Sequence, residues 1–76
     1  MEELLAWIAR GLVDEPDAVR VERVDELDAV VLRLSVASDD VGKVIGRQGR
    51  VARALRTLVR SAGGRGDRRL VLEIQG

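Results

Sequence analysis

The 76-residue sequence contains no cysteine, histidine, tyrosine or phenylalanine, and it has a single tryptophan and a single proline. Without cysteine the chain forms no disulfide and offers no thiolate to a metal, which fits a reducing compartment. Without histidine or cysteine, the roles of general base and nucleophile would fall to carboxylates, to Lys43 or to hydroxyl groups. None of the hydroxyls stands at a motif spacing from a base. We therefore expect no enzymatic activity, no cofactor and no metal site.

A long hydrophobic run is also absent. The N-terminal stretch MEELLAWIARGLV carries Glu2 and Glu3 where a secretory signal carries positive charge, and Arg10 interrupts its apolar residues. This pattern predicts neither a signal peptide nor a membrane span. We expect a cytoplasmic protein that has no membrane partner.

The formal net charge of zero hides an asymmetry along the chain. Residues 1–40 carry eleven acids and four bases, whereas residues 41–76 carry nine bases and two acids. Such a split favours a basic surface that attracts polyanions. The alternative is that the two halves fold together and pair their opposite charges into an ordinary salt-bridged surface. Both interpretations remain open at this point.

Hydrophobic periodicity predicts six elements in the order helix, strand, strand, helix, helix, strand. Their expected ranges are 2–13, 18–24, 29–37, 39–45, 50–62 and 68–75. A polar turn lets the first two strands pair antiparallel, and the helix pair is long enough to return the third strand parallel to the second. All three helices must then cover one face of a three-stranded mixed sheet. The expected class is α+β, with a single domain over residues 1–76.

The same periodicity predicts which side chains face the core. The first helix should bury Leu4, Leu5, Ile8 and Leu12, and the fifth element should bury Val51, Leu55, Leu58, Val59 and Ala62. On the sheet, Arg33, Ser35 and Glu73 should lie on the face that the helices leave open. Ser38 or Asp39 should cap the helix that follows the second strand. The sequence GGRGD, residues 63–67, should form a loop.

The stretch IGRQGR, residues 45–50, interrupts a helical pattern with two glycines. Gly46 can adopt a backbone conformation that closes a helix, and Gly49 removes a side chain from the start of the next one. The start of a helix carries partial positive charge and unpaired amides, so anions bind there. Lys43, Arg47 and Arg50 add positive charge with no acid near them in sequence. Phosphate is the expected ligand.

Mononucleotide sites are poorly supported. A Rossmann fingerprint needs G-x-G-x-x-G directly after a strand, and a Walker loop needs G-x-x-x-x-G-K-[ST]; neither occurs. A G-x-x-G turn between two helices is instead typical of a loop that clamps a single-stranded nucleic-acid backbone. Trp7 is the only aromatic residue, which argues against a surface on which bases stack.

The string VIGRQGR between two helices resembles the GXXG loop of the KH domain, and the preceding helix and strand match the bacterial type II order. Through DVGKVIGRQGRVARALRTLVR, residues 40–60, the chain resembles the KhpA (YlqC) family of single-KH RNA-binding proteins. The resemblance implies that Gly46, Arg47, Gln48 and Gly49 clamp single-stranded RNA. It also implies an aliphatic groove, with Val41, Val44, Ile45 and either Leu34 or Val36 as candidates. Lys43, Arg50 and Arg53 would add positive charge.

The same resemblance implies partners and a cellular role. Proteins of this kind are taken to self-associate, to pair with a larger KH protein of the KhpB (Jag) type, and to act as RNA chaperones in cell-envelope and cell-length control. A groove for four nucleotides binds weakly, so a second groove on a partner would raise affinity through effective concentration. The alternative is a protein-interaction or dimerisation module with little or no affinity for RNA.

Overall fold

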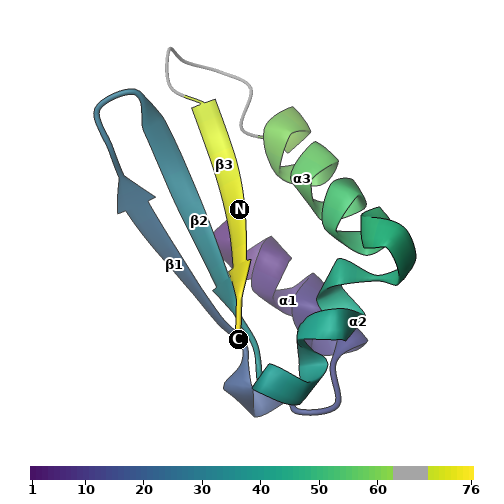
Figure 1. Cartoon of the computed structure of the whole chain (residues 1–76). Helices are drawn as coiled ribbons and strands as arrows, with labels where there is room; N and C mark the ends of the chain where they lie inside the picture. Colours follow the sequence, from purple (N-terminus) through teal and green to yellow (C-terminus); the bar gives the residue numbers. More distant parts are fainter. Residues whose placement is uncertain (63–68) are drawn as a thin grey trace.

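A computed structural model describes residues 1–62 and 69–76 of the chain. A three-stranded sheet carries the helices on one face (Figure 1). The elements are α1 (Glu2–Leu12), β1 (Arg20–Asp25), β2 (Ala29–Ser35), α2 (Val41–Ile45), α3 (Arg50–Ala62) and β3 (Arg69–Gln75). Short 3-10 turns at Pro16–Ala18, Ser38–Asp40 and Arg47–Gly49 connect them. The predicted α+β class and the order of elements are confirmed.

The strands are arranged in the order β1-β2-β3, so β2 is central. Strand β1 pairs antiparallel with β2, and β3 pairs parallel with it. A parallel return requires a crossover, which α2 and α3 provide. The predicted mixed topology is therefore confirmed, and the crossover places the loop between α2 and α3 at one end of the sheet.

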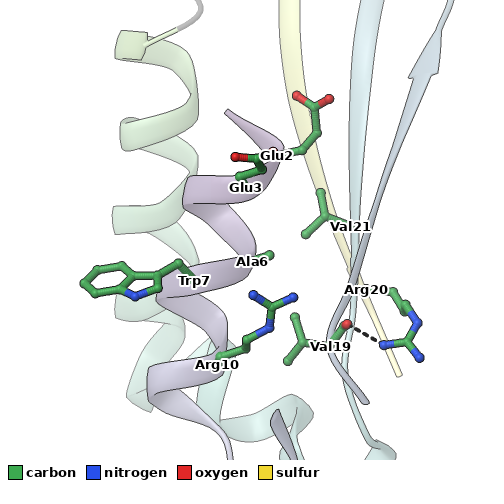
Figure 2. A pocket seen from close by; sticks show the side chains of 8 residues that line it. All are labelled: Glu2, Glu3, Ala6, Trp7, Arg10, Val19, Arg20 and Val21. Carbon is green, nitrogen blue, oxygen red and sulfur yellow. Dashed lines mark hydrogen bonds between the residues drawn. The ribbon is translucent and has the colours of Figure 1, made fainter. Parts of the chain in front are cut away.

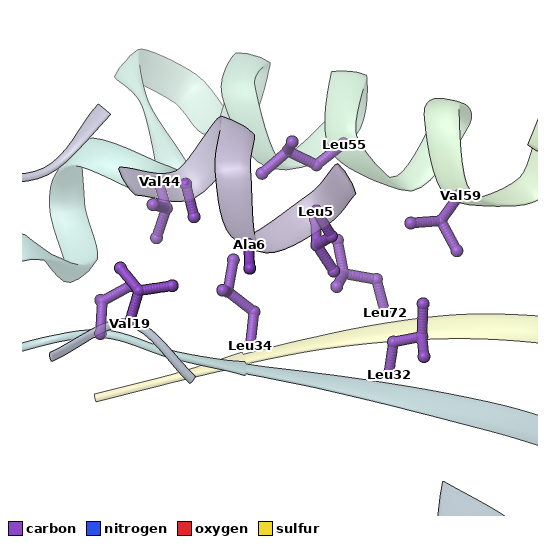
Figure 3. Close-up of a cluster of buried hydrophobic side chains, with 11 residues drawn as sticks. Leu5, Ala6, Val19, Leu32, Leu34, Val44, Leu55, Val59 and Leu72 are labelled. Carbon is purple, nitrogen blue, oxygen red and sulfur yellow. The ribbon is translucent and has the colours of Figure 1, made fainter. Parts of the chain in front are cut away.

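Helix α1 buries the predicted Leu5 and half-buries the predicted Ile8, but the rest of its buried stripe differs from the predicted one. Leu5 and Ala9 are fully buried and Ala6 nearly so, whereas the predicted core residues Leu4 and Leu12 are 43% and 37% exposed. The two alanines lack long side chains, so they let the helix pack closely against other elements. Figure 3 shows Leu5 and Ala6 in the buried cluster together with Leu32 and Leu34 of the sheet.

Helix α3 packs as predicted at its centre. Leu55 and Val59 are buried, with Ala52 beside them, while Val51 and Leu58 are half-buried. The side chain of Ala62 and the loop predicted at 63–67 lie outside the described residues. On the open face of the sheet, Arg33 forms ion pairs with Glu22 (3.5 Å) and Glu73 (3.1 Å), as the alternation predicted.

Within the part of the chain that the structure describes, no helix is both long enough and apolar enough to cross a membrane.

Candidate nucleic-acid interface

The loop of residues 46–49 has an unusual backbone. Gly46, Gln48 and Gly49 have φ values of 78°, 58° and 75°, in the region that residues with a Cβ rarely adopt. The amide of Gly46 donates to the carbonyl of Gly42 (2.8 Å) and thereby closes α2. Three positive φ values within these four residues turn the chain sharply into α3. The side chains of Arg47 and Gln48 are exposed at the turn.

The two glycines are required for different reasons. A Cβ on Gly46 would lie 2.5 Å from Cγ2 and 2.9 Å from the backbone nitrogen of Val51, so α3 packs directly against this residue. A Cβ on Gly49 would meet no atom within 4 Å, so only its backbone conformation favours glycine. The open space at Gly49 leaves the start of α3 accessible from outside.

Most amides around the loop already donate hydrogen bonds within the chain. Gly49 donates to the carbonyl of Gly46 (3.1 Å), and Arg50 donates to the carbonyl of Arg47. With Gly46 bonded to Gly42, the amides of Arg47 and Gln48 are the loop's remaining candidates to donate to an external anion. At most two amides of the loop are therefore left to bind an anion, and both belong to an exposed turn.

Arg53 holds the loop from α3. Its Nη2 donates to the carbonyl oxygen of Gln48 at 2.7 Å. This bond fixes Gln48, the one residue other than glycine that has a positive φ among residues 1–62 and 69–76. Sequence reasoning placed Arg53 near the loop only as an added charge; the direct contact depends on a backbone carbonyl, which leaves no signal in the residue pattern.

Lys43 does not lie among free charges. Its Nζ forms ion pairs with Asp14 (3.0 Å) and Asp40 (3.1 Å), and hydrogen bonds to these two carboxylates raise the pKa of Lys43. The expectation that Lys43 lacks a counter-charge was wrong, because Asp40 stands three residues before it and the segment after α1 folds beside α2 and brings Asp14 to it. The charge of Lys43 is therefore largely compensated before any ligand binds.

The buried Asp40 also connects the segment after α1 to α2. It is 1% exposed, and its Oδ2 accepts a hydrogen bond from the amide of Glu15 at 3.0 Å. Burial alone would raise the pKa of this carboxyl group, but the bonds from Glu15 and Lys43 outweigh it and hold the pKa below 3.8. The predicted cap at Ser38 or Asp39 was wrong, because neither α2 nor the preceding 3-10 turn has a side-chain cap.

The predicted groove residues divide into surface and core. Val41 and Ile45 are half-buried and still offer surface beside the loop. Val44 is fully buried in the main core cluster (Figure 3). It therefore offers no surface to a ligand and instead supports the floor of the predicted groove from inside. The strand candidates, Leu34 at 0% and Val36 at 4% exposed, also belong to the core.

The arginines of the loop and of α3 remain uncompensated. Helix α3 contains four arginines and no acidic residue. In the described ranges, five arginines around the loop and along α3 are exposed and form no ion pair with an acid, namely Arg47, Arg50, Arg53, Arg56 and Arg60. By contrast, Arg23, Arg33 and Lys43 each have acidic partners. Unpaired arginines are therefore concentrated along α3 and the loop, although the exposed Arg10, Arg20 and Arg69 also form no ion pair within the described ranges.

Sequence reasoning left the position of Trp7 open between core and contact surface. The side chain is 71% exposed. Figure 2 shows it projecting from α1 away from Val19 and Val21, which line an open pocket between α1 and the start of β1. Leu4 and Leu12 add exposed apolar surface on the same helix. Among residues 1–62 and 69–76, no group of three or more acidic side chains could hold a metal ion.

The order of the elements and the glycine loop between two helices define a KH domain. The chain belongs to the KhpA/KhpB KH-domain family, whose family model matches residues 2–74. It is 47% identical to the RNA-binding protein KhpA of Caldanaerobacter subterraneus subsp. tengcongensis, over 97% of this chain and 99% of the relative. Identity to the RNA-binding protein KhpA of Treponema pallidum is 52%, over 96% and 91% of the two chains. No solved structure matches this chain.

Proposed function

We propose that this chain is a single, non-catalytic KH domain over residues 1–76 that binds single-stranded RNA through the loop 46–49. The observation that carries the proposal is the exposed turn itself: Arg47 and Gln48 project from it, and Arg47 has no acidic partner among the described residues. Its relatives of nearly the same length are named RNA-binding proteins, which supports the same ligand.

Each residue of the site has a proposed role. Gly46 and Gly49 keep the backbone bare, so that a sugar-phosphate chain can approach closely. Arg47 and Gln48 contact phosphate through their side chains and amides, and Arg50 adds charge at the start of α3. The half-buried Val41 and Ile45 provide apolar contact for a base, over Val44 in the core. Lys43 and Arg53 are positioning residues, since one fixes α2 and the other fixes the loop.

We further propose that the domain acts as an RNA chaperone together with a KhpB (Jag)-type KH partner or a second copy, in post-transcriptional and cell-envelope or cell-length control. Similarity to the family supports this role. The physical reason for a partner is that one short groove gives low affinity, which a second groove raises through effective concentration. The exposed apolar residues of α1 provide a surface on which such a partner could bind.

The test is the double substitution Arg47→Asp and Gln48→Asp, measured by RNA binding. Aspartate tolerates the left-handed conformation at position 48, so the fold and the melting curve should stay unchanged while binding is lost. The matched control is Arg23→Glu with Leu27→Asp, which changes the net charge equally at exposed positions in β1 and in the turn that follows it. Wild-type affinity should fall with salt at a slope of about −2 for about three phosphate contacts. Binding that survives the loop variant would reject the proposed site.

A second candidate function is favoured by one observation, the 71% exposure of Trp7 beside the exposed Leu4. In that case the chain is mainly an interaction module, and affinity for RNA is residual. Sedimentation of the loop variant at micromolar concentration separates the two functions. A dimer that persists while wild-type protein shows no RNA binding would favour the interaction module; a monomer at all concentrations would remove its support.

A further inference from the structure

The exposed flank of α3 next to the loop carries a row of arginines. Arg53, Arg56 and Arg60 are spaced three and four residues apart, so they lie along one side of the helix. Arg53 donates to the carbonyl of Gln48, which places this side of α3 directly beside the loop. With a rise of about 1.5 Å per residue, the row extends roughly 10 Å along the helix from that contact. The proposed function leaves Arg56 and Arg60 without a role.

These charges are unfavourable in the free protein. Like charges three or four residues apart repel each other, and Arg50 stands at the positive end of the helix dipole. The usual compensation is absent, because α3 contains no acidic residue and Arg56 and Arg60 form no ion pair within the described residues. Elsewhere the chain does supply acids to its bases, as at Arg33 and Lys43. The arrangement fits a surface that is neutralised by a bound polyanion.

We propose that Arg56 and Arg60 bind successive phosphates of the RNA strand beyond the loop 46–49, so that the strand runs along α3. The contact surface then exceeds the four nucleotides that a KH loop clamps. The uncharged Thr57 lies between the two arginines, and its hydroxyl donates back to the carbonyl of Arg53, so nothing acidic interrupts the path. This inference rests on the proposed function, because it requires that the strand first occupies the loop.

An acidic protein surface could also pair with these arginines. The contact between Arg53 and Gln48 favours RNA, because it makes the arginine row continuous with the loop rather than a separate patch. If the arginines served only to bind an acidic protein, their removal would not affect RNA binding in a way that depends on RNA length. Dependence on RNA length is therefore the property to measure.

The experiment compares random-sequence RNA of four nucleotides with random-sequence RNA of about ten nucleotides. Wild-type protein should bind the longer RNA more tightly than additional binding registers explain, and its salt slope should be steeper by about 1.4, which corresponds to two further phosphate contacts. The variant Arg56→Gln with Arg60→Gln should lose about 5- to 30-fold in affinity for the longer RNA and less than about twofold for the shorter one. The matched control, Arg20→Gln with Arg23→Gln, removes the same charge from β1 and should change neither affinity.

Three results would overturn the inference. An equal loss for both RNA lengths, or an equal loss in the control, would show that the arginines act only through overall charge. No loss at either length would show that the strand leaves the loop in another direction. With any of these results the proposed function would still hold, provided that the wild-type protein binds the shorter RNA and the loop variant does not. If the wild-type protein binds neither RNA, the proposed function itself fails and this inference fails with it.

Melting curves verify that the variants fold. Neutralising Arg56 and Arg60 should leave the melting temperature equal or higher.

Discussion

Helices α1 and α3 lie on the same face of the sheet (Figure 1), and their exposed side chains are of opposite kinds. Helix α1 presents Trp7 and Leu4 to solvent, and α3 presents Arg56 and Arg60. Both helices use small residues for close packing, Ala6 and Ala9 in one and Ala52 in the other. The buried stripe fixes where each helix lies, while the exposed side is free to serve a function. The comparison indicates two surfaces suited to two kinds of partner, one apolar and one anionic.

The distribution of ion pairs follows the same division. In the region around α1, β1 and α2, several bases pair with acids, as in Lys43 with Asp14, although Arg10 and Arg20 form no ion pair within the described residues. Along α3 no such pair occurs among the described residues. Exposed pairs stabilise a fold little, so this difference matters for binding more than for folding. Substitutions that disturb one region and spare the other can test the comparison.

The largest combined effect on stability and RNA binding is expected at Gly46, where α3 meets the loop. In Gly46→Ala the new methyl group would overlap Val51, and alanine would have to adopt a φ near 78°. Strain and overpacking together should lower the free energy of unfolding by about 2–4 kcal/mol and abolish RNA binding. Chemical denaturation measures the first effect. Gly49→Ala, which has open space, should lose only about 1 kcal/mol. Equal losses in the two variants would contradict the close contact with Val51.

The next largest effect is expected at Asp40, which joins the segment after α1 to α2 by accepting from Glu15 and Lys43. Asn cannot carry the negative charge, so Asp40→Asn should lower the melting temperature at neutral pH. The folded-state pKa of Asp40 is lowered from its usual value, so its stabilisation is complete only above about pH 5 and is lost progressively as the pH falls through the unfolded and then the folded pKa. Thermal melts from pH 7 to pH 2 should therefore show a steeper acid decline in the wild type than in the variant. The exposed neighbour provides the control, Asp39→Asn, which should behave as wild type.

Much of this fold could be predicted from local patterns. The valine-rich alternation around Leu32 and the helical repeat of Leu55 and Val59 reflect periods that side-chain burial imposes directly. The glycine loop was also predictable, since Gly46 ends one apolar repeat and Gly49 precedes the next. The buried stripe of α1 was predicted only in part. The interpretation counted large aliphatic residues, which include Leu5, and missed Ala6 and Ala9.

The details of the site depended on tertiary contacts. Nothing local distinguishes Val44 from Val41, although one lies in the core and the other is partly exposed. The ion pair between Lys43 and Asp14 joins residues far apart in the sequence. Charge counting could thus locate the basic half of the chain, but it could not determine which charges remain unpaired after folding.

A smaller effect is expected at Arg53, where the loop and α3 are connected by one exposed hydrogen bond. Arg53→Gln should lower the free energy of unfolding by about 0.5–1 kcal/mol, and it should weaken RNA binding by releasing Gln48. Arg56→Gln on the same flank is the control, since Arg56 has no such bond within the described residues; it should leave stability unchanged or slightly improved. If both variants lose equal stability, the bond to Gln48 contributes nothing specific.

The smallest effect on the folded monomer is expected at Trp7, because its side chain is largely in solvent. Trp7→Ser should change the free energy of unfolding by no more than about 0.5 kcal/mol and leave binding of a short RNA unchanged. Leu5→Ala, in the fully buried part of the same helix, should lose about 2–5 kcal/mol. If α1 is the apolar contact surface, sedimentation should show that Trp7→Ser weakens self-association while the loop variant does not. A loss of stability in Trp7→Ser comparable to that of Leu5→Ala would mean that the ring packs against the fold, and the contrast between α1 and α3 would then no longer hold.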